Sequence, residues 1–233
     1  MSAFGGPNII DNGLVLYLDA GNRKSYTSGS TTWFDKSGFN NNGTLTNGPT
    51  FNTGSGGSIV FDGTNDYVDM GNVLPLGTSN FTCNFWFRTP TGIDGYLISK
   101  KNAGYTANTA GFGIFKDTSG GRIRITISDG SSVATPFLGT TDVGTNTWLN
   151  CCVVINRTSG LCTNYLNSIA DNPQNIAGVT GNINNSTNLI IASGFDSWAQ
   201  FDGQIAITQI YNRALTAAEI LQNYNATKGR FGL

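Results

Sequence analysis

Residues 201–216 read FDGQIAITQIYNRALT and predict a change from strand to helix within one short stretch. The run from Gly203 to Tyr211 is rich in apolar and β-branched residues, as in a strand of a buried sheet. Thr216 then stands three residues before Glu219, which is the spacing of a capping box at a helix start. We therefore expect a helix over about Thr216 to Asn225 and a structural, non-catalytic role for Glu219.

The letters FDG recur at residues 61–63, where they open the acidic stretch FDGTNDYVD. Other apolar or alternating runs are typical of β-strands and cover residues 13–19, 58–61, 67–70, 81–88, 95–100, 111–116, 122–128, 147–156, 161–168, 188–192 and 203–211. Asn-Gly, Asp-Gly and Gly-Gly pairs lie between the runs, and such pairs accept the positive φ of tight turns. The sequence predicts one all-β domain, a sandwich or barrel with antiparallel pairing, and the helix on its rim or edge.

The charge and hydropathy of the chain limit the classes of partner that it could bind. The net charge of -1 and the scattered Lys and Arg residues provide no basic field for a phosphate backbone, so we expect no nucleic acid. No run of residues is long and apolar enough for a membrane helix, and the N-terminus lacks the features of a secretory signal. We therefore expect no membrane partner, and synthesis and folding in the cytoplasm.

The sequence contains no histidine, which excludes Ser-His-Asp and Cys-His nucleophilic catalysis. Thirteen of the 14 acidic residues are Asp, and the single Glu219 is assigned to the capping box. A glycosidase built on a glutamate pair is therefore excluded as well. We predict that the protein is not an enzyme, with an Asp-only glycoside hydrolase built on Asp62 and Asp66 as a remote alternative.

The four cysteines, Cys83, Cys151, Cys152 and Cys162, all lie in apolar strand-like runs. The adjacent pair should point to opposite faces of one strand. We expect four buried free thiols, and the alternative is a disulfide between Cys162 and either Cys151 or Cys152.

A series of short motifs occurs along the chain in the order in which one known family of domains has them. They are LYLD (16–19), DKSG (35–38), NGTL (42–45), IVFDG (59–63), DYV (66–68), LISK (97–100), GFG (111–113), YLN (165–167) and the closing FDGQI to IYNRALT. Over about residues 13–226 the chain resembles laminin-G-like, concanavalin A-like lectin/glucanase domains. The resemblance implies an all-β, two-sheet antiparallel jelly-roll sandwich with one short C-terminal helix, as a single domain over residues 1–233. The family includes lectins, adhesion modules, glucanases and virion proteins, and the Glu-rich catalytic strand of the glucanases is missing here.

The compact start over residues 6–22 also resembles stand-alone jelly-roll proteins of tailed bacteriophages. This implies a non-enzymatic virion structural protein, a head decoration, fibre or tail appendage, assembled in the host cytoplasm. Its partners would be other virion proteins or its own copies in a homo-oligomer, and a cell-surface glycan. The alternative is a carbohydrate-binding adhesion module of a bacterium, at the cell surface or secreted by a signal-independent route.

The acidic stretch is a candidate calcium site. Asp62, Asn65, Asp66 and Asp69 offer the hard oxygen ligands that calcium takes. The family often binds calcium at a loop rim. The alternative interpretation is that these residues only form a turn, since Asp-Gly and Asn-Asp are ordinary turn formers.

The stretch SGFDSWAQ (193–200) is a candidate glycan or partner loop. Phe195 and Trp198 offer aromatic faces for the C–H surface of a sugar, and Asp196 and Gln200 offer polar groups that orient hydroxyls. The alternative is that the two aromatic residues cover one end of the core.

Overall fold

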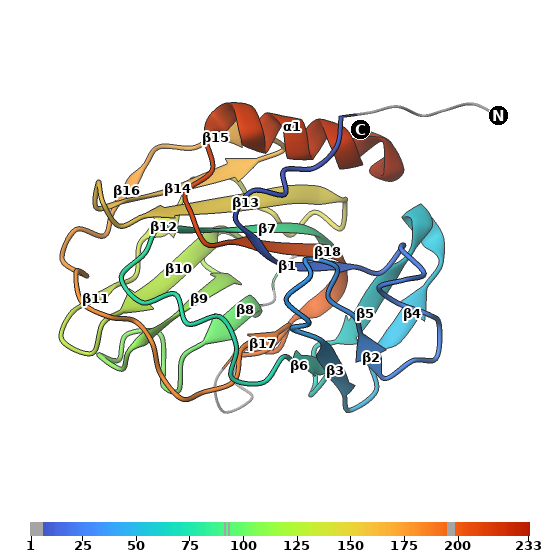
Figure 1. Ribbon diagram of the computed structural model, residues 1–233, viewed down its shortest axis with the longest axis horizontal. Helices are drawn as coiled ribbons and strands as arrows, with labels where there is room; N and C mark the ends of the chain where they lie inside the picture. Colours follow the sequence, from blue (N-terminus) through green and yellow to red (C-terminus); the bar gives the residue numbers. More distant parts are fainter. Residues whose placement is uncertain (1–6, 91, 93, 195–198) are drawn as a thin grey trace.

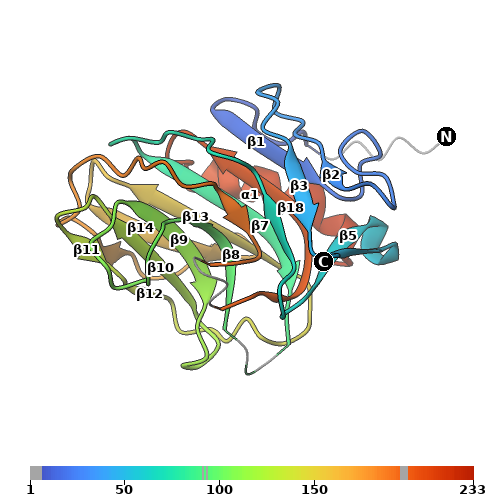
Figure 2. The same ribbon diagram turned by 90° about the horizontal axis from the view of Figure 1, so that it is seen from below.

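The computed structural model describes residues 7–90, 92, 94–194 and 199–233. Over these residues it is a sandwich of two antiparallel sheets, each with nine strands, as predicted (Figure 1). Figure 2 views the sandwich from the side of the second sheet, with the C-terminal helix behind the strands.

Sheet A runs in the order β15-β14-β13-β7-β18-β5-β4, with β1 paired to β18 and β16 to β14. Its strands are β1 (Leu14–Asp19), β4 (Thr50–Asn52), β5 (Ser58–Asp62), β7 (Phe81–Arg88), β13 (Leu149–Asn156), β14 (Leu161–Leu166), β15 (Ile169–Ala170), β16 (Gln174–Asn175) and β18 (Asp202–Tyr211). The long strand β18 is central because it pairs with β7 along one edge and with β5 and β1 along the other.

Sheet B runs in the order β11-β10-β9-β8-β17-β6-β3-β2, with β12 paired to β10. Its strands are β2 (Thr32–Trp33), β3 (Gly43–Thr46), β6 (Tyr67–Asp69), β8 (Gly95–Lys100), β9 (Gly111–Lys116), β10 (Ile123–Ser128), β11 (Val133–Ala134), β12 (Phe137–Leu138) and β17 (Ile190–Ile191). In β10 the three isoleucines enter the core and the residues between them lie on the outer face, as the alternation predicts.

The two FDG motifs are neighbours in sheet A. In the pairing of β5 with β18, Asp62 lies opposite Asp202 and Phe61 lies opposite Gly203. The rings of Phe61 and Phe201 meet edge to face in the core, with centroids 6.2 Å apart. The repeated motif therefore marks one corner of the sandwich at which two strands and two core aromatic residues meet.

Helix α1 (Ala217–Thr227) begins with the predicted capping box of Thr216 and Glu219. It lies over the outer face of sheet A, so the prediction of a rim or edge position is wrong (Figure 1). The physical reason is that this face is itself apolar: Tyr211, Leu215 and Ile220 form one buried cluster there. Two 3-10 helices, η1 (Gly54–Gly56) and η3 (Lys228–Phe231), complete the helical part that the structure describes.

All four cysteines are free and buried, as predicted. Cys151 lies in the core between the sheets and Cys152 lies under α1, which confirms that the adjacent pair faces opposite sides of β13. Burial raises the pKa of each thiol.

The two sheets differ in what covers them. Helix α1 and residues 7–12 cover much of the outer face of sheet A, whereas no helix in the described part of the chain covers sheet B. None of the described helices is long and apolar enough to cross a membrane. The outer face of sheet B is therefore the broad strand surface on which a site would be accessible.

Candidate functional site

The outer face of sheet B carries two adjoining hollows, of about 390 and 420 Å³, which we call together the sheet B groove. They adjoin because Asn188 lines both. The first is also lined by Ser99, Lys101, Ser186, Thr187, Ile190 and Gly194, and the second by Asn42, Thr44, Thr46, Asp69, Met70 and Gly71. Hydroxyl and amide groups dominate this lining, and such groups can donate to and accept from the hydroxyl groups of a ligand.

The floor of the sheet B groove is a row of residues across four strands. Thr44 of β3 lies opposite Asp69 of β6, Asp69 lies opposite Ile190 of β17, and Ile190 lies opposite Ser99 of β8. Opposite residues in antiparallel strands share a face. Because the neighbouring Val68 enters the core, this row must lie on the outer face.

Asp69 and Asn188 form the centre of the sheet B groove. The side-chain amide of Asn188 donates to the two carboxylate oxygens of Asp69 at 2.9 and 3.0 Å, and the Gly71 N–H donates to Asp69 at 2.8 Å. These contacts fix the orientation of both side chains. The carboxylate and the carbonyl oxygen of Asn188 can then accept hydrogen bonds from ligand hydroxyl groups.

Lys101 forms one wall of the sheet B groove without offering a free N–H donor. Its ammonium donates to the Ala107 carbonyl at 2.6 Å, the Thr109 carbonyl at 3.0 Å and the Thr109 hydroxyl at 2.9 Å. An ammonium group has three N–H donors, so these three acceptors use all of them. Burial lowers the pKa of Lys101. Its role is to hold the 101–110 loop in place beside the groove.

The neighbouring Lys100 acts in the same way. Its ammonium donates to Asn72 Oδ1 at 2.8 Å and to the Thr187 carbonyl at 2.7 Å, which fixes the segment just before Asn188. The side chain is 3% exposed, and burial lowers its pKa to about 8. The structure thus supports the groove with two lysines that sequence reasoning did not single out.

The four residues of the predicted calcium site do not converge. Asp62 and Asp66 lie together in the turn between β5 and β6, where the Asp62 N–H donates to Asp66 at 3.2 Å. Burial, reinforced by the charge of Asp62, raises the pKa of Asp66. The Asn65 carbonyl accepts from the Asn47 amide at 2.9 Å, and Asp69 lies at the far end of β6 in the groove.

These contacts agree with the turn interpretation of FDGTNDYVD. Across the described residues there is no group of three or more Asp, Glu, Cys or His side chains arranged to hold a metal ion. Calcium binding there stays a prediction that no carboxylate cluster supports.

The predicted glycan loop adjoins the sheet B groove through Gly194, which lines it. Phe195, Asp196 and Trp198 lie outside the described residues. Gln200 is described, is 7% exposed, and its side-chain amide has no hydrogen-bond partner among the described residues. A buried amide without a partner is uncommon in proteins and usually meets a water or a ligand.

Sequence reasoning found Asp69 and the neighbourhood of Gly194 but missed Asn188, Thr44 and Ser99. These three belong to segments far apart in the chain, and β17 has only two residues. The run at residues 188–192 was predicted as a strand, but the sequence pattern does not specify its partner strands or its register.

Comparison with known proteins agrees with this architecture. A family model described as the concanavalin A-like lectin/glucanases superfamily matches residues 62–221. The crystal structure of the binding domain of Paraclostridial Mosquitocidal Protein 1 is 20% identical and matches with a TM-score of 0.72 over 93% of this chain and 52% of that one. No curated protein matches the sequence.

Two binding domains of botulinum neurotoxins are also similar. The serotype G binding domain is 19% identical, with a TM-score of 0.67 over 91% of this chain and 50% of that one. The serotype D ligand binding domain, crystallised in complex with N-acetylneuraminic acid, is 15% identical, with a TM-score of 0.68 over 92% of this chain and 51% of that one. The chain thus spans about half the length of these toxin domains, and the likeness shows the fold.

Proposed function

Because the chain belongs to the concanavalin A-like lectin/glucanase superfamily, we propose that it is a non-enzymatic binding domain that recognises a glycan in the sheet B groove. The observation that carries the proposal is the Asp69–Asn188 pair, fixed at the centre of a hydroxyl-rich groove on the uncovered sheet. The solved neighbours are themselves described as binding domains, and one was crystallised with a sialic acid.

The charges of the groove favour a neutral glycan. Asp69 is the only carboxylate among the described residues that line it, and the Lys101 ammonium already has three acceptors. A sialic acid would place its own carboxylate near Asp69, and the Lys101 ammonium has no N–H donor left to pair with it. Neutral hexoses and their N-acetyl derivatives offer hydroxyl donors that Asp69 and Asn188 accept.

The absence of a catalytic role is part of the same proposal. Acid-base hydrolysis of a glycoside needs two carboxyl groups on either side of the scissile bond. Asp69 has no second carboxylate beside it in the described lining of the groove. The remote alternative, an Asp-only hydrolase at Asp62 and Asp66, is tested by turnover of a polysaccharide that disappears in Asp66→Asn.

A glycan array tests the proposed function. We expect binding to neutral glycans that weakens in Asn188→Ala, with sialylated glycans bound less well than their neutral counterparts. An array without any reproducible ligand, or binding that Asn188→Ala leaves unchanged, would contradict the proposal.

The virion role predicted from the sequence is a further part of the proposal. In that setting the domain is displayed on a phage head or tail, contacts other virion proteins or its own copies, and binds a host-surface glycan. The genomic neighbourhood tests it: adjacent capsid and tail genes are expected, and a secretion or adhesion locus would instead favour the bacterial adhesion module.

A further inference from the structure

A second pocket, of about 830 Å³, lies on the opposite side of the sandwich from the sheet B groove, over the outer face of sheet A. Four separate parts of the chain line it: the N-terminal residues 7–9, strand β1, strand β18 and the C-terminal residues 225–230. We call it the strapped pocket, because the N-terminal residues cross beside α1 and close one side.

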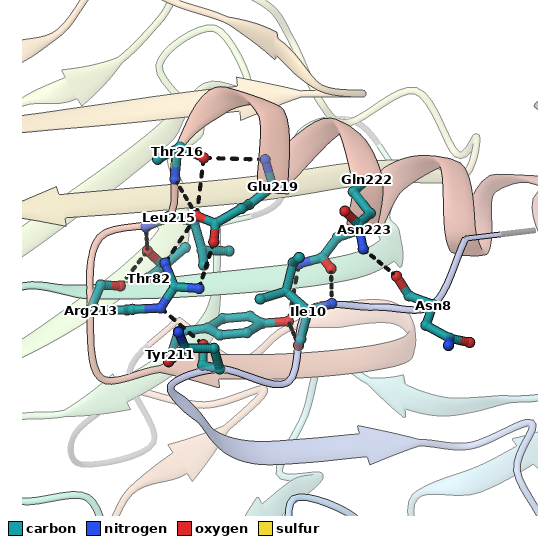
Figure 3. A network of polar contacts seen from close by, with 11 residues as sticks. Asn8, Ile10, Thr82, Tyr211, Arg213, Leu215, Thr216, Glu219, Gln222 and Asn223 are labelled. Atoms are coloured by element: carbon teal, nitrogen blue, oxygen red, sulfur yellow. Dashed lines mark hydrogen bonds and ion pairs between the residues drawn. The ribbon is translucent and has the colours of Figure 1, made fainter.

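Hydrogen bonds hold that strap to the helix (Figure 3). The Ile10 N–H donates to Asn223 Oδ1 at 2.8 Å, and the Gln222 side-chain amide donates to the Asn8 carbonyl at 2.8 Å. The Tyr211 hydroxyl donates to the Ile10 carbonyl at 3.0 Å. This wall of the strapped pocket is therefore formed before any ligand arrives, which lowers the entropy cost of binding.

The C-terminal wall of the strapped pocket is also held in place, like the N-terminal strap. Phe231 stacks on Trp86 of β7 with ring centroids 4.0 Å apart. The Arg230 guanidinium donates to the Ser55 carbonyl at 2.7 Å and also to the Gly57 carbonyl, which joins η3 to η1. The position of Arg230 in the pocket lining is thus set from two sides.

An ion pair lies in the strapped pocket. Arg230 donates to Asp19, and their side chains are 19% and 14% exposed. The Tyr17 hydroxyl donates to the other oxygen of Asp19 at 3.3 Å, and burial raises the pKa of Tyr17 so that it stays a donor. The opposite charges cancel, so the pocket favours a ligand without net charge.

Arg230 and Asp19 can still form further hydrogen bonds. Arginine has five N–H donors, and the described contacts of Arg230 use three of them. A carboxylate has about four acceptor positions, and Asp19 uses three: for Arg230, Gly21 and Tyr17. The ion-paired Asp19 and Arg230 side chains thus keep about one acceptor position and two N–H donors beyond these contacts.

Vicinal hydroxyl groups match this arrangement, since one hydroxyl donates to a carboxylate while its neighbour accepts from a guanidinium. The Tyr17 ring and Ile207 line the same pocket and can contact the C–H face of a sugar, and Asn225 adds an exposed amide. We propose that the strapped pocket is a second ligand site, which takes a neutral saccharide through a pair of vicinal hydroxyl groups. The inference shares only the class of ligand with the proposed function and does not depend on the sheet B groove.

Protein NMR of the whole chain tests the inference with defined probes, the methyl glycosides of glucose, mannose and galactose. At least one is expected to shift the backbone amide signals of Ile207 and Ala226. Fully O-methylated versions of the same glycosides lack hydroxyl donors and should not produce these shifts. No shift with any of the three glycosides, or equal shifts with the methylated forms, would overturn the inference.

Two matched variants test whether the glycoside binds in the strapped pocket. Ala226→Trp fills the strapped pocket without removing a hydrogen bond, and we expect at least a tenfold loss of affinity. Ala218→Trp makes the same change at an exposed position of the same helix and should bind like the wild type. Should Ala226→Trp fail to fold, Asn225→Ala serves instead, with a severalfold loss expected. Unchanged affinity in the folded pocket variant refutes the site.

The variant Asn188→Ala distinguishes a saccharide site in the strapped pocket from the glycan site proposed in the sheet B groove. Shifts at Ile207 and Ala226 that persist in Asn188→Ala support the strapped pocket, whatever happens at the sheet B groove. Shifts confined to groove residues such as Thr44 and Ser99 support the proposed function and overturn this inference alone.

Discussion

Asn188 and Asp69 are 119 positions apart in the sequence, yet the amide of the first donates to both carboxylate oxygens of the second. The pairing of β17 with β6 brings them together, because Ile190 lies opposite Asp69 and Asn188 stands two residues before Ile190. A carboxylate fixed by an amide keeps one orientation, and a preoriented acceptor binds a ligand hydroxyl at lower entropic cost.

Replacing Asn188 by Ala should therefore weaken glycan binding about tenfold, since one or two hydrogen bonds and the orientation of Asp69 are lost. Calorimetric titration with the best ligand from an array measures the effect. Asn172→Ala is the matched control, because Asn172 is exposed and contributes only its backbone carbonyl to a described hydrogen bond. Equal losses in both variants would show that the groove is not responsible.

The Arg213–Glu219 pair should make stability depend on acid pH. Arg213 donates to both oxygens of Glu219, at 2.9 and 2.7 Å, and this contact lowers the pKa of Glu219 to about 2 from its ordinary 4.5 (Figure 3). A depressed pKa contributes stability that is fully present above 4.5 and is lost as the pH falls towards about 2.

Glu219→Gln should accordingly lower the free energy of unfolding by up to about 1 kcal/mol at neutral pH, because the pair is partly exposed. The difference from the wild type should shrink as the pH is lowered from 4.5 to about 2. Denaturant unfolding at several pH values measures it, with Asp11→Asn as a control for the loss of one exposed acid. A difference that stays constant with pH would contradict the assignment.

Much of the sandwich was predictable because its long strands carry clear signals. The strands Phe81–Arg88, Gly95–Lys100 and Gly111–Lys116 were predicted with their observed bounds. The predicted helix start is confirmed because a capping box depends only on residues four positions apart or fewer.

The pairing of the short strands and the position of α1 depend on tertiary contacts. The short strand β3, which carries Thr44, was not predicted. The run at residues 188–192 was predicted as a strand and contains β17, but its pairing with β6 and β8 was not predicted. The position of α1 was mispredicted because strand β7 is apolar on both faces: Trp86 is buried on the outer face of sheet A under Phe231. From sequence alone both faces of a strand rich in apolar residues look the same.

The four thiols should be unreactive in the native protein. Each is fully buried, and burial raises its pKa, so the reactive thiolate is scarce. A thiol reagent such as Ellman's reagent should label no cysteine before denaturation and all four after it. Fewer than four after denaturation without reductant would instead support the alternative disulfide.

Calcium addition and chelation should leave the melting temperature unchanged, because Asp69 is already bound by Asn188 and Gly71 and lies apart from Asp62 and Asp66. A ligand that binds only the folded state raises stability by RT ln(1 + [L]/Kd), so scanning calorimetry detects binding sensitively. A rise with calcium that disappears in Asp66→Ala would restore the calcium site predicted from the sequence.

Phe231 should be the residue through which the C-terminal end stabilises the sandwich. Its ring is 9% exposed, stacks on Trp86 at 4.0 Å and lies 4.9 Å from Trp148. Phe231→Ala should lower the free energy of unfolding by about 3 kcal/mol, at the low end for buried aromatic residues because the site lies near solvent.

The same substitution should change the fluorescence of the native protein, because Trp86 loses one of the rings stacked on it and gains contact with water. Leu233→Ala is the control: it removes an apolar side chain two residues away that is 50% exposed, and we expect a change below about 0.5 kcal/mol. Urea unfolding followed by far-UV circular dichroism gives both values. If the two variants lose equal stability, the stack of Phe231 on Trp86 does not anchor η3.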